Sequence, residues 1–466
     1  MRDATDRPNI ILINCDDLGY GDLGCYGSTV NRTPALDRMA AEGVRFTDFY
    51  QASGLCSPSR GAMMTGCYPR RIGFGTFEGH GVLFPGQPVG LSTDETTIAG
   101  ILKGRGYATK IVGKWHCGDQ PEFLPTRHGF DSYYGLPYSN DMGRQAGHGK
   151  QWPPLPLLRD EEVIQEQPDQ TSLTERYVEE CVRFIRDKKD EPFLLYLAHM
   201  HVHLPLYAPD CFLKNSQNGR YGAVVECVDW ATSVLFDELK RQGIDENTLV
   251  VFTSDNGSRV RGEGGSNAPL HGTKATTWEG GQRLPCIMRW PGVIPAGTEC
   301  REIAASLDFL PSFAALAGGA PPDDRTIDGK DIRPLMFGAQ GAVSPHDAFF
   351  YYLRDDLDAV RSGKWKLFEG RTTGGGKDRR RETICELYDL ENDIGETTNV
   401  ADANPDVVAA LAKKMEACRQ ELGDASRDIE GTGCRPSGQV PEGKPLTEYD
   451  EKHPYIISMY DLPNRG

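Results

Sequence analysis

Short apolar runs alternate with helical patterns over the first two-thirds of the chain, and this alternation restricts the fold more than any other feature. The apolar runs predicted to be strands are 10–13, 110–112, 193–197, 249–253 and 286–289. The segments with helical patterns are 33–42, 97–105, 172–187, 221–242 and 308–317. This order predicts an α/β sandwich around a large, mostly parallel sheet. Sites in such sheets form at the carboxyl ends of the strands.

The pattern changes near residue 346, which indicates a second, smaller domain. Segments 348–353, 358–368 and 386–390 have the character of antiparallel strands. Segment 404–422 is predicted to be an amphipathic helix that starts near Pro405 and ends at Gly423. We therefore expect one domain over residues 1–345 and an α+β domain with an antiparallel sheet over residues 346–466, whose tail wraps the surface.

Composition excludes several classes of function. The 466 residues carry a net charge of −16, which argues against non-specific binding to nucleic acid. No apolar run is long enough to span a membrane. The chain shows no signal peptide, so we expect a cytoplasmic protein or one whose leader has been removed. The 13 cysteines include no Cys-x-x-Cys pair, which argues against a zinc framework.

Acidic and amide side chains follow two of the predicted strands. Asp16 and Asp17 come after the first strand, and Asp255 and Asn256 come after the fourth. Each pair taken alone is typical of a loop or a turn. Together they offer oxygen ligands without His or Cys, which suits Ca²⁺ or Mg²⁺ better than Zn²⁺.

Basic residues follow other strands. Lys114 and His116 come after the second strand, and Lys274 lies in a later glycine-rich segment. A lysine taken alone is more often a solvated surface charge. Three alternate histidines after the third strand would share one face of an extended segment and offer a competing zinc site: His199, His201 and His203.

Residues 56–66 read Cys-Ser-Pro-Ser-Arg-Gly-Ala-Met-Met-Thr-Gly, and no packing argument explains them. Pro58 favours a turn into a helix, and the N-terminus of that helix would attract anions. Arg60 would add a fixed positive charge nearby. A lone cysteine is usually a buried structural residue, but that interpretation leaves the rest of the stretch without a reason.

The stretch resembles the signature of type I sulfatases, Cys-x-Pro-Ser-Arg-x-x-x-x-Thr-Gly, at every defining position. Further segments resemble sulfatase motifs in the expected order: 16–27, 113–116, 255–257, 272–285 and 387–393. The similarity covers about residues 8–423 and is greatest to the arylsulfatase A-like branch. It implies an alkaline-phosphatase-like fold and hydrolysis of a carbohydrate or aryl sulfate monoester to an alcohol and sulfate.

The resemblance also implies cofactors and roles. Cys56 would be oxidised by a formylglycine-generating enzyme to Cα-formylglycine, the nucleophile. The implied ligands of Ca²⁺, with Mg²⁺ as the alternative, are Asp16, Asp17, Cys56, Asp255 and Asn256. The implied sulfate pocket comprises Arg60, Lys114, His116 and Lys274. His203 would protonate the leaving alcohol, with His201 as second choice, and Asp255 and His116 would accept protons in the two successive steps.

Three alternatives remain open from the residues. They are a phosphonate monoester or phosphodiester hydrolase of the same superfamily, a non-catalytic calcium-dependent binder of sulfated glycans, and a zinc hydrolase that uses the three histidines. The sequence does not identify the sulfated substrate, whether a small molecule or a glycan. Candidate residues at the mouth of the pocket are Tyr138, Asp141, His148 and Arg261, and the basic run 377–381 is interpreted as a solvated loop.

Overall fold

The computed structural model describes residues 7–144, 152–373, 380–452 and 454. Four strands lie at the centre of its main sheet: β1 (Asn9–Cys15), β4 (Ala108–Gly113), β8 (Phe193–Ala198) and β9 (Thr248–Ser254). The flanking strands are β2 (Val44–Tyr50), β5 (Ser132–Gly135), β6 (Pro156–Arg159), β7 (Glu162–Glu166), β10 (Arg283–Arg289), β11 (Thr298–Cys300) and β12 (Ala304–Ala305). Within the described residues they form one sheet of 11 strands, the large sheet.

The centre of the large sheet is parallel and its margins are mixed. The strand order is β11-β2-β10-β9-β1-β8-β4-β5-β6-β7, and β12 pairs with β2. β1 runs parallel to both β8 and β9, and β4 runs parallel to β8 and β5. β10 is antiparallel to β9 and β2, as β6 is to β5. This confirms the predicted mixed, mostly parallel sheet.

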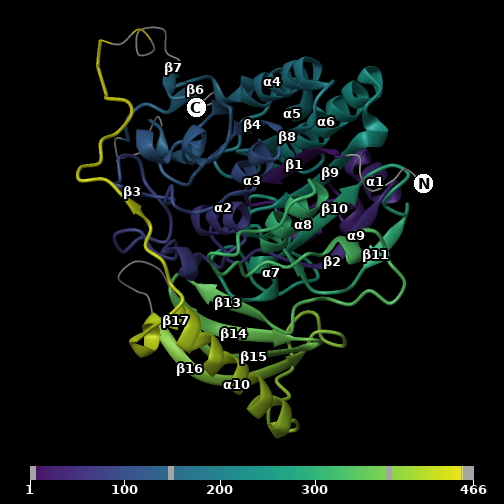
Figure 1. The fold of residues 1–466 in the computed structure, drawn as a ribbon, viewed down its shortest axis with the longest axis vertical. Helices are drawn as coiled ribbons and strands as arrows, with labels where there is room; N and C mark the ends of the chain where they lie inside the picture. The colour runs from purple at the N-terminus through teal and green to yellow at the C-terminus, as the bar shows by residue number, and fades with distance from the viewer. Residues whose placement is uncertain (1–6, 145–151, 374–379, 453, 455–466) are drawn as a thin grey trace.

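Helices cover both faces of the large sheet (Figure 1). One face carries α2 (Cys56–Thr65), α3 (Ile98–Gly104), α8 (Phe309–Leu316) and α9 (Arg333–Met336). The other carries α1 (Pro34–Ala41), α4 (Leu173–Lys188) and α6 (Gly219–Gln242), with the short α5 (Asp210–Leu213) packed on α6. Alternate residues of β1 explain the two layers, because Ile10 and Leu12 pack in the first core and Ile11 and Ile13 in the second.

A second, antiparallel sheet lies at the lower end of the molecule in Figure 1. This small sheet has the order β13 (Phe349–Leu353), β14 (Asp356–Ser362), β15 (Trp365–Thr373) and β16 (Arg380–Asp389). The helix α10 (Pro405–Leu422) packs against β14 and β15. The antiparallel sheet and its helix match the predicted α+β character, and the domain division between residues 345 and 346 stays a prediction.

One predicted strand of the small sheet was wrong. Segment 358–368 is two strands, because Gly363 and Lys364 form a tight turn that pairs Ser362 with Trp365. Gly363 has a φ of +54°, in the left-handed region that such turns require. Apolar residues on both sides of the turn made the segment resemble one continuous strand.

A buried cluster of charged residues joins the two sheets, and we call it the seam cluster. Its members are Asp48, Glu279, Arg283, Arg361, Lys366 and Glu396. Lys366 Nζ lies 2.9 Å from both Glu279 Oε1 and Glu396 Oε1, and it also donates to the carbonyl oxygen of Thr277 (2.8 Å). Arg361 and Arg283 approach Asp48 at 2.6 and 2.9 Å. The small sheet thereby holds α7 (Glu279–Gln282) and the loop that precedes it.

The chain after α10 returns to the first part of the chain and forms two short, separate sheets. β17 (Gly423–Asp424) pairs with β18 (Ile429–Glu430), and β19 (Gly438–Gln439) pairs with β3 (Val89–Gly90). Arg435 lies 2.6 Å from Glu95, so this tail contacts regions far away in sequence. Among the described helices, none combines the length and the apolar character needed to cross a membrane.

Candidate active site

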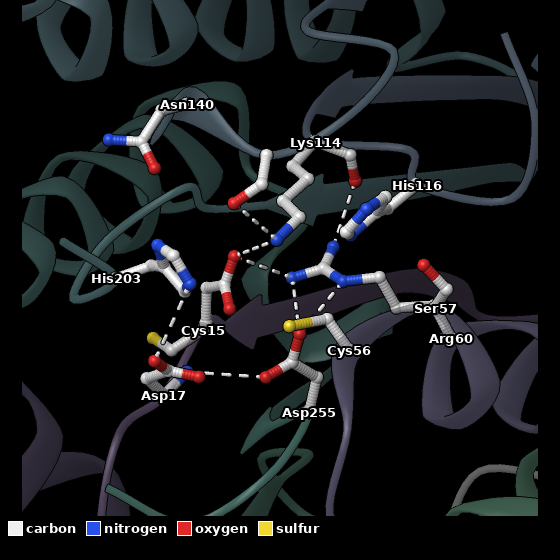
Figure 2. Close-up of polar contacts among 12 residues, drawn as sticks. Cys15, Asp17, Cys56, Ser57, Arg60, Lys114, His116, Asn140, His203 and Asp255 are labelled. Carbon is white, nitrogen blue, oxygen red and sulfur yellow. Dashed lines mark hydrogen bonds and ion pairs between the residues drawn. The ribbon is translucent and has the colours of Figure 1, made fainter. Parts of the chain in front are cut away.

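The predicted site residues meet at the carboxyl ends of four adjacent parallel strands (Figure 2). Asp16 and Asp17 follow β1, and Asp255 follows its neighbour β9. Lys114 follows β4, and His203 lies shortly after β8. Because these strands share one direction, a single edge of the sheet collects side chains that are far apart in sequence.

Cys56 occupies the first position of α2, at the helix N-terminus that the sequence indicated. Every residue of this helix is buried, and Cys56 is 2% exposed. Ser59 Oγ donates to the carbonyl oxygen of Cys56 (2.9 Å), and the backbone N–H of Leu83 donates to Ser57 Oγ (3.1 Å). These bonds fix the first turn, whose free N–H groups place positive partial charge beside Cys56.

Burial raises the pKa of the Cys56 thiol to about 12, although Lys114 and Lys274 act in the opposite direction. At neutral pH the encoded thiol is therefore protonated and a weak nucleophile. The residue has the position of a nucleophile but, as encoded, not the reactivity of one.

Three cations surround the carboxylates. Arg60 Nε donates to Asp255 Oδ2 (2.8 Å), and its Nη1 donates to the carbonyl oxygen of Lys114 (2.9 Å). Lys114 Nζ forms an ion pair with Asp16 Oδ2. Lys274 Nζ lies 2.6 Å from Asp17 Oδ1 and 3.4 Å from the Sγ of Cys56. The pocket around Cys56 is therefore lined by positive charge on several sides.

The two neighbouring carboxyl groups of the cluster have opposite pKa shifts. Burial and the charge of Asp16 raise the pKa of Asp255 to about 6. Burial would also raise the pKa of Asp16, but Lys114, His203 and Arg60 hold it well below its usual range. Two carboxylates this close cannot both be ionised at low cost without additional positive charge.

Buried oxygens without partners indicate where that additional charge would bind. Asp16 Oδ1, Asp17 Oδ2 and Asn256 Oδ1 have no hydrogen-bond partner among the described residues. Asn256 Nδ2 donates to Asp17 Oδ1 (2.7 Å), which fixes the amide. One ligand atom from each of Asp16, Asp17, Cys56 and His203 lies within 4.8 Å of the others. The unpartnered oxygens of Asp16, Asp17 and Asn256 are the ligands that a hard divalent cation prefers.

Asp255 and His203 occupy different positions relative to this group. Asp255 Oδ1 accepts the backbone N–H of Asp17 (3.2 Å) and its Oδ2 accepts from Arg60, so both of its oxygens are engaged. His203 Nε2 lies 3.8 Å from Asp17 Oδ2, which places the imidazole beside the cluster. The sequence analysis did not include His203 among the metal-binding residues.

Residues 8–320 match the family described as Sulfatase, and residues 272–421 match the one described as N-sulphoglucosamine sulphohydrolase, C-terminal. The chain belongs to the sulfatase family. Human arylsulfatase A is 39% identical over 455 residues, covering 89% of this chain and 88% of that protein. The N-acetylgalactosamine-6-sulfatase of Canis lupus familiaris is 42% identical over 380 residues, covering 78% and 72%.

Among solved structures, that of Ps i-CgsB in complex with k-i-k-neocarrahexaose has a TM-score of 0.76 and 32% sequence identity. The match covers 88% of this chain and 92% of that chain. These comparisons confirm the type I sulfatase family, the alkaline-phosphatase-like α/β fold and the activity of a sulfuric ester hydrolase. They imply, in general terms, a bound metal and a formylglycine.

The three histidines of this sulfatase lie in different surroundings. Burial lowers the pKa of His199 to about 3 and that of His201 to about 4. The backbone carbonyl of His201 accepts from the N–H of Asp16 (2.8 Å), whereas the His203 ring faces the cluster. Within the described residues the three rings do not form a metal-binding group, so nothing supports a zinc hydrolase.

Sequence reasoning missed Ser139, whose Oγ accepts from Lys114 Nζ (3.2 Å). Ser139 follows β5 just as Lys114 follows β4, but the short segment 132–135 was not recognised as a strand. Of the residues proposed at the mouth, Arg261 lines a cavity beside Lys274, whereas Tyr138 is buried. His148 and most of the basic run 377–381 lie outside the described residues, and Asp141 is partly exposed.

Proposed function

We propose that this sulfatase hydrolyses a carbohydrate or aryl sulfate monoester with a formylglycine made from Cys56 by a formylglycine-generating enzyme. The observation that carries the proposal is the position of Cys56: a buried thiol at a helix N-terminus, 3.4 Å from Lys274 Nζ. An unmodified thiol in this state gives no reason for the surrounding charges. A formylglycine hydrate supplies two hydroxyl groups, one to attack sulfur and one to release the sulfate afterwards.

We further propose Ca²⁺, with Mg²⁺ as the alternative, as the metal, held by Asp16, Asp17, Asp255, Asn256 and the modified Cys56. The support is the set of unpartnered oxygens on Asp16, Asp17 and Asn256, none of which is a soft ligand. When bound, the cation supplies positive charge to the sulfate and to the nucleophile. The residues around it must still position the ester and move protons.

Arg60, Lys114 and Lys274 bind the sulfate and compensate its charge in a site largely closed to water. Asp255 accepts the proton of the attacking hydroxyl, because it is held by Arg60 close to Asp17 and the nucleophile. His116 accepts the second proton, since its Nε2 is held at 3.1 Å from the carbonyl oxygen of Leu83 and its Nδ1 has no partner among the described residues.

His203 protonates the leaving alcohol, together with Lys274. His203 is favoured over His201 because its ring lies beside Asp17 and retains 7% exposure, whereas His201 is only 1% exposed. The leaving group must reach the ring from the solvent side of the sulfate, and His203 is the more accessible of the two. His201 remains the second choice.

The test is replacement of Cys56. Cys56→Ala should abolish turnover of an aryl sulfate while leaving the melting temperature unchanged. Intact-mass analysis of the peptide that contains Cys56 should show the aldehyde in active wild-type protein. Cys211→Ala is the matched control, because Cys211 is exposed, lies in α5 and is not one of the active-site residues. Multiple turnovers by Cys56→Ala, or an active protein with an unmodified thiol, would contradict the proposal.

A further inference from the structure

A cavity of about 640 Å³ lies beside Cys56, between the two sheets. It is lined by Leu55, which precedes the nucleophile position, and by the segment 273–278, which carries Lys274. Residues between 80 and 84, Arg261, and residues of the small sheet and its first turn complete the wall. We call it the mouth pocket and define it by six residues: His80, Arg261, Lys274, Trp278, Arg354 and Arg371.

The charge of the mouth pocket differs from that of the whole protein. Its lining includes three arginines and a lysine, and no Asp or Glu among the described residues. The whole chain has 67 acidic and 51 basic residues. An acidic protein that concentrates cations around one concave surface focuses positive potential there, which attracts anionic ligands.

Arg371 is held rigidly in this pocket by aromatic contacts. Its guanidinium lies 4.5 Å from the ring centroid of Trp278, and that ring in turn stacks on His271 at 4.2 Å and contacts Phe368 at 4.9 Å. One end of Arg371 pairs with Glu386, while its Nε is buried and has no partner among the described residues. A guanidinium fixed in this way loses little side-chain entropy when it binds an anion.

Arg261 also lines the mouth pocket and is exposed. The nearby Glu263 accepts the backbone N–H of Arg261 (2.7 Å) and lies 3.4 Å from Arg259 Nε. The Arg261 guanidinium itself has no partner within the described part of the chain. Arg354 is different, because its Nη1 approaches the carbonyl oxygen of Gly79 at 3.4 Å.

We propose that the mouth pocket binds a second anionic group, a carboxylate or a second sulfate, on the alcohol part of the substrate. The preferred substrate is then an acidic carbohydrate sulfate rather than a neutral monosulfate. This inference rests on the proposed function. The sulfate under attack is already compensated by Arg60, Lys114 and Lys274, so the exposed Arg261 guanidinium would face no opposite charge in a neutral alcohol. Carboxylate and sulfate both match the paired donors of a guanidinium.

The test compares matched substrates on Arg261→Gln, an exposed position where the change should not affect folding. The substrates are 4-nitrophenyl sulfate, a sulfated disaccharide with a uronic acid, its carboxyl-reduced counterpart and a disulfated disaccharide. Arg261→Gln should lower kcat/KM for the uronate or the disulfated substrate by about 10-fold, mainly through KM. The two neutral-alcohol substrates should change by less than about twofold. The control is Arg259→Gln, in the same loop but outside the lining.

Equal effects on the acidic and neutral substrates, or no effect on either, would overturn the inference. If kcat/KM falls for only one of the uronate and disulfated substrates, that result identifies which anion the mouth pocket binds. Arg371→Gln should have the same selective effect, and its melting temperature shows whether packing on Trp278 is also lost.

A binding measurement separates this inference from the proposed function. Calorimetric titration of Cys56→Ala with the same disaccharides requires no turnover. A preference of about 10-fold for the acidic ligand that disappears in Cys56→Ala/Arg261→Gln supports the pocket even if the wild-type protein hydrolyses nothing. Turnover of 4-nitrophenyl sulfate without any such preference supports the proposed function and overturns the pocket.

Discussion

The active site and the seam cluster are both made of buried carboxylates and cations, but they differ in how completely their atoms are paired. Every carboxylate of the seam cluster lies within 2.9 Å of a cation: Asp48, Glu279 and Glu396. Tyr50 and Tyr351 also donate to Glu279, at 2.6 and 2.7 Å. In the active site, by contrast, oxygens of Asp16, Asp17 and Asn256 have no partner in the described part of the chain.

This difference in pairing distinguishes a cluster that holds the fold together from a site that binds a ligand. A buried polar atom without a partner costs free energy, so protein interiors rarely contain several together. The seam cluster pairs every carboxylate with a cation and so connects two sheets; even Glu396 Oε1, which has no hydrogen bond among the described residues, lies 2.9 Å from Lys366 Nζ. The active site leaves atoms unsatisfied in one place, which is what a site that binds a cation and an anionic ester requires. The following experiments test this contrast, from the largest expected effect to the smallest.

Removal of divalent cations should affect the active site far more than the seam cluster. Chelation should lower the turnover of an aryl sulfate by about four orders of magnitude, because the charges of Asp16 and Asp17 are then uncompensated. Addition of Ca²⁺ should restore activity and raise the melting temperature. Activity assays and calorimetry before and after chelation measure both effects. An enzyme that stays active after exhaustive chelation would contradict the metal assignment.

Lys366→Met should damage the seam cluster. The substitution leaves Glu279 and Glu396 buried without their common cation, and we expect a loss of about 3–5 kcal/mol in the free energy of unfolding. Denaturant titration measures it. Lys364→Met is the matched control, because Lys364 is 38% exposed where it pairs with Asp389 and should contribute about 1 kcal/mol or less. Equal effects of the two substitutions would show that the seam cluster does not stabilise the fold.

Asp17→Asn should weaken the active site without weakening the fold. The variant retains an oxygen but loses a charge, so we expect Ca²⁺ affinity to fall by about 10–100-fold. The melting temperature of the chelated protein should change little, while its increase on adding Ca²⁺ should be smaller than in the wild type. Asp402→Asn, at an exposed position, provides the control. An unchanged Ca²⁺ response in Asp17→Asn would remove Asp17 from the ligand set.

A second contact between the two parts of the chain predicts a small effect of pH on stability. His346 Nε2 lies 2.7 Å from Asp308 Oδ1. Burial lowers the pKa of His346, but the Asp308 carboxylate outweighs it and the net shift is upward. Because the pKa of His346 is higher in the folded state, the protonated ion pair stabilises the fold fully at pH values below the unfolded pKa of about 6.5. This stabilisation is lost as the pH rises through the folded pKa. The stability difference between wild type and His346→Gln should therefore shrink from about pH 5.5 to about pH 8.5. A constant difference would show that the pair does not titrate.

Much of this structure follows from local patterns in the sequence. The apolar runs located the central strands, and residues directly after them proved to lie together because parallel strands end at one edge. The turn at Gly363 was missed because the apolar residues before and after it follow the spacing of a strand, so the whole segment resembled one continuous strand. Ser139 was missed because four residues are too short a strand to recognise. The seam cluster and the mouth pocket join segments far apart in sequence, and no local pattern indicates such contacts.

The burial of α2 has a consequence for the timing of biosynthesis. Cys56 is enclosed by residues that are synthesised much later, and Lys274, 218 positions further along the chain, is one of them. At synthesis rates of about 5–20 residues per second, this interval lasts roughly 10 to 40 seconds. Under the proposed function, the enzyme that modifies Cys56 acts before folding encloses this residue, and the active fraction of a preparation then reflects how far modification has gone by that point. Slower translation between these two positions would raise the yield of active protein without any change in its sequence.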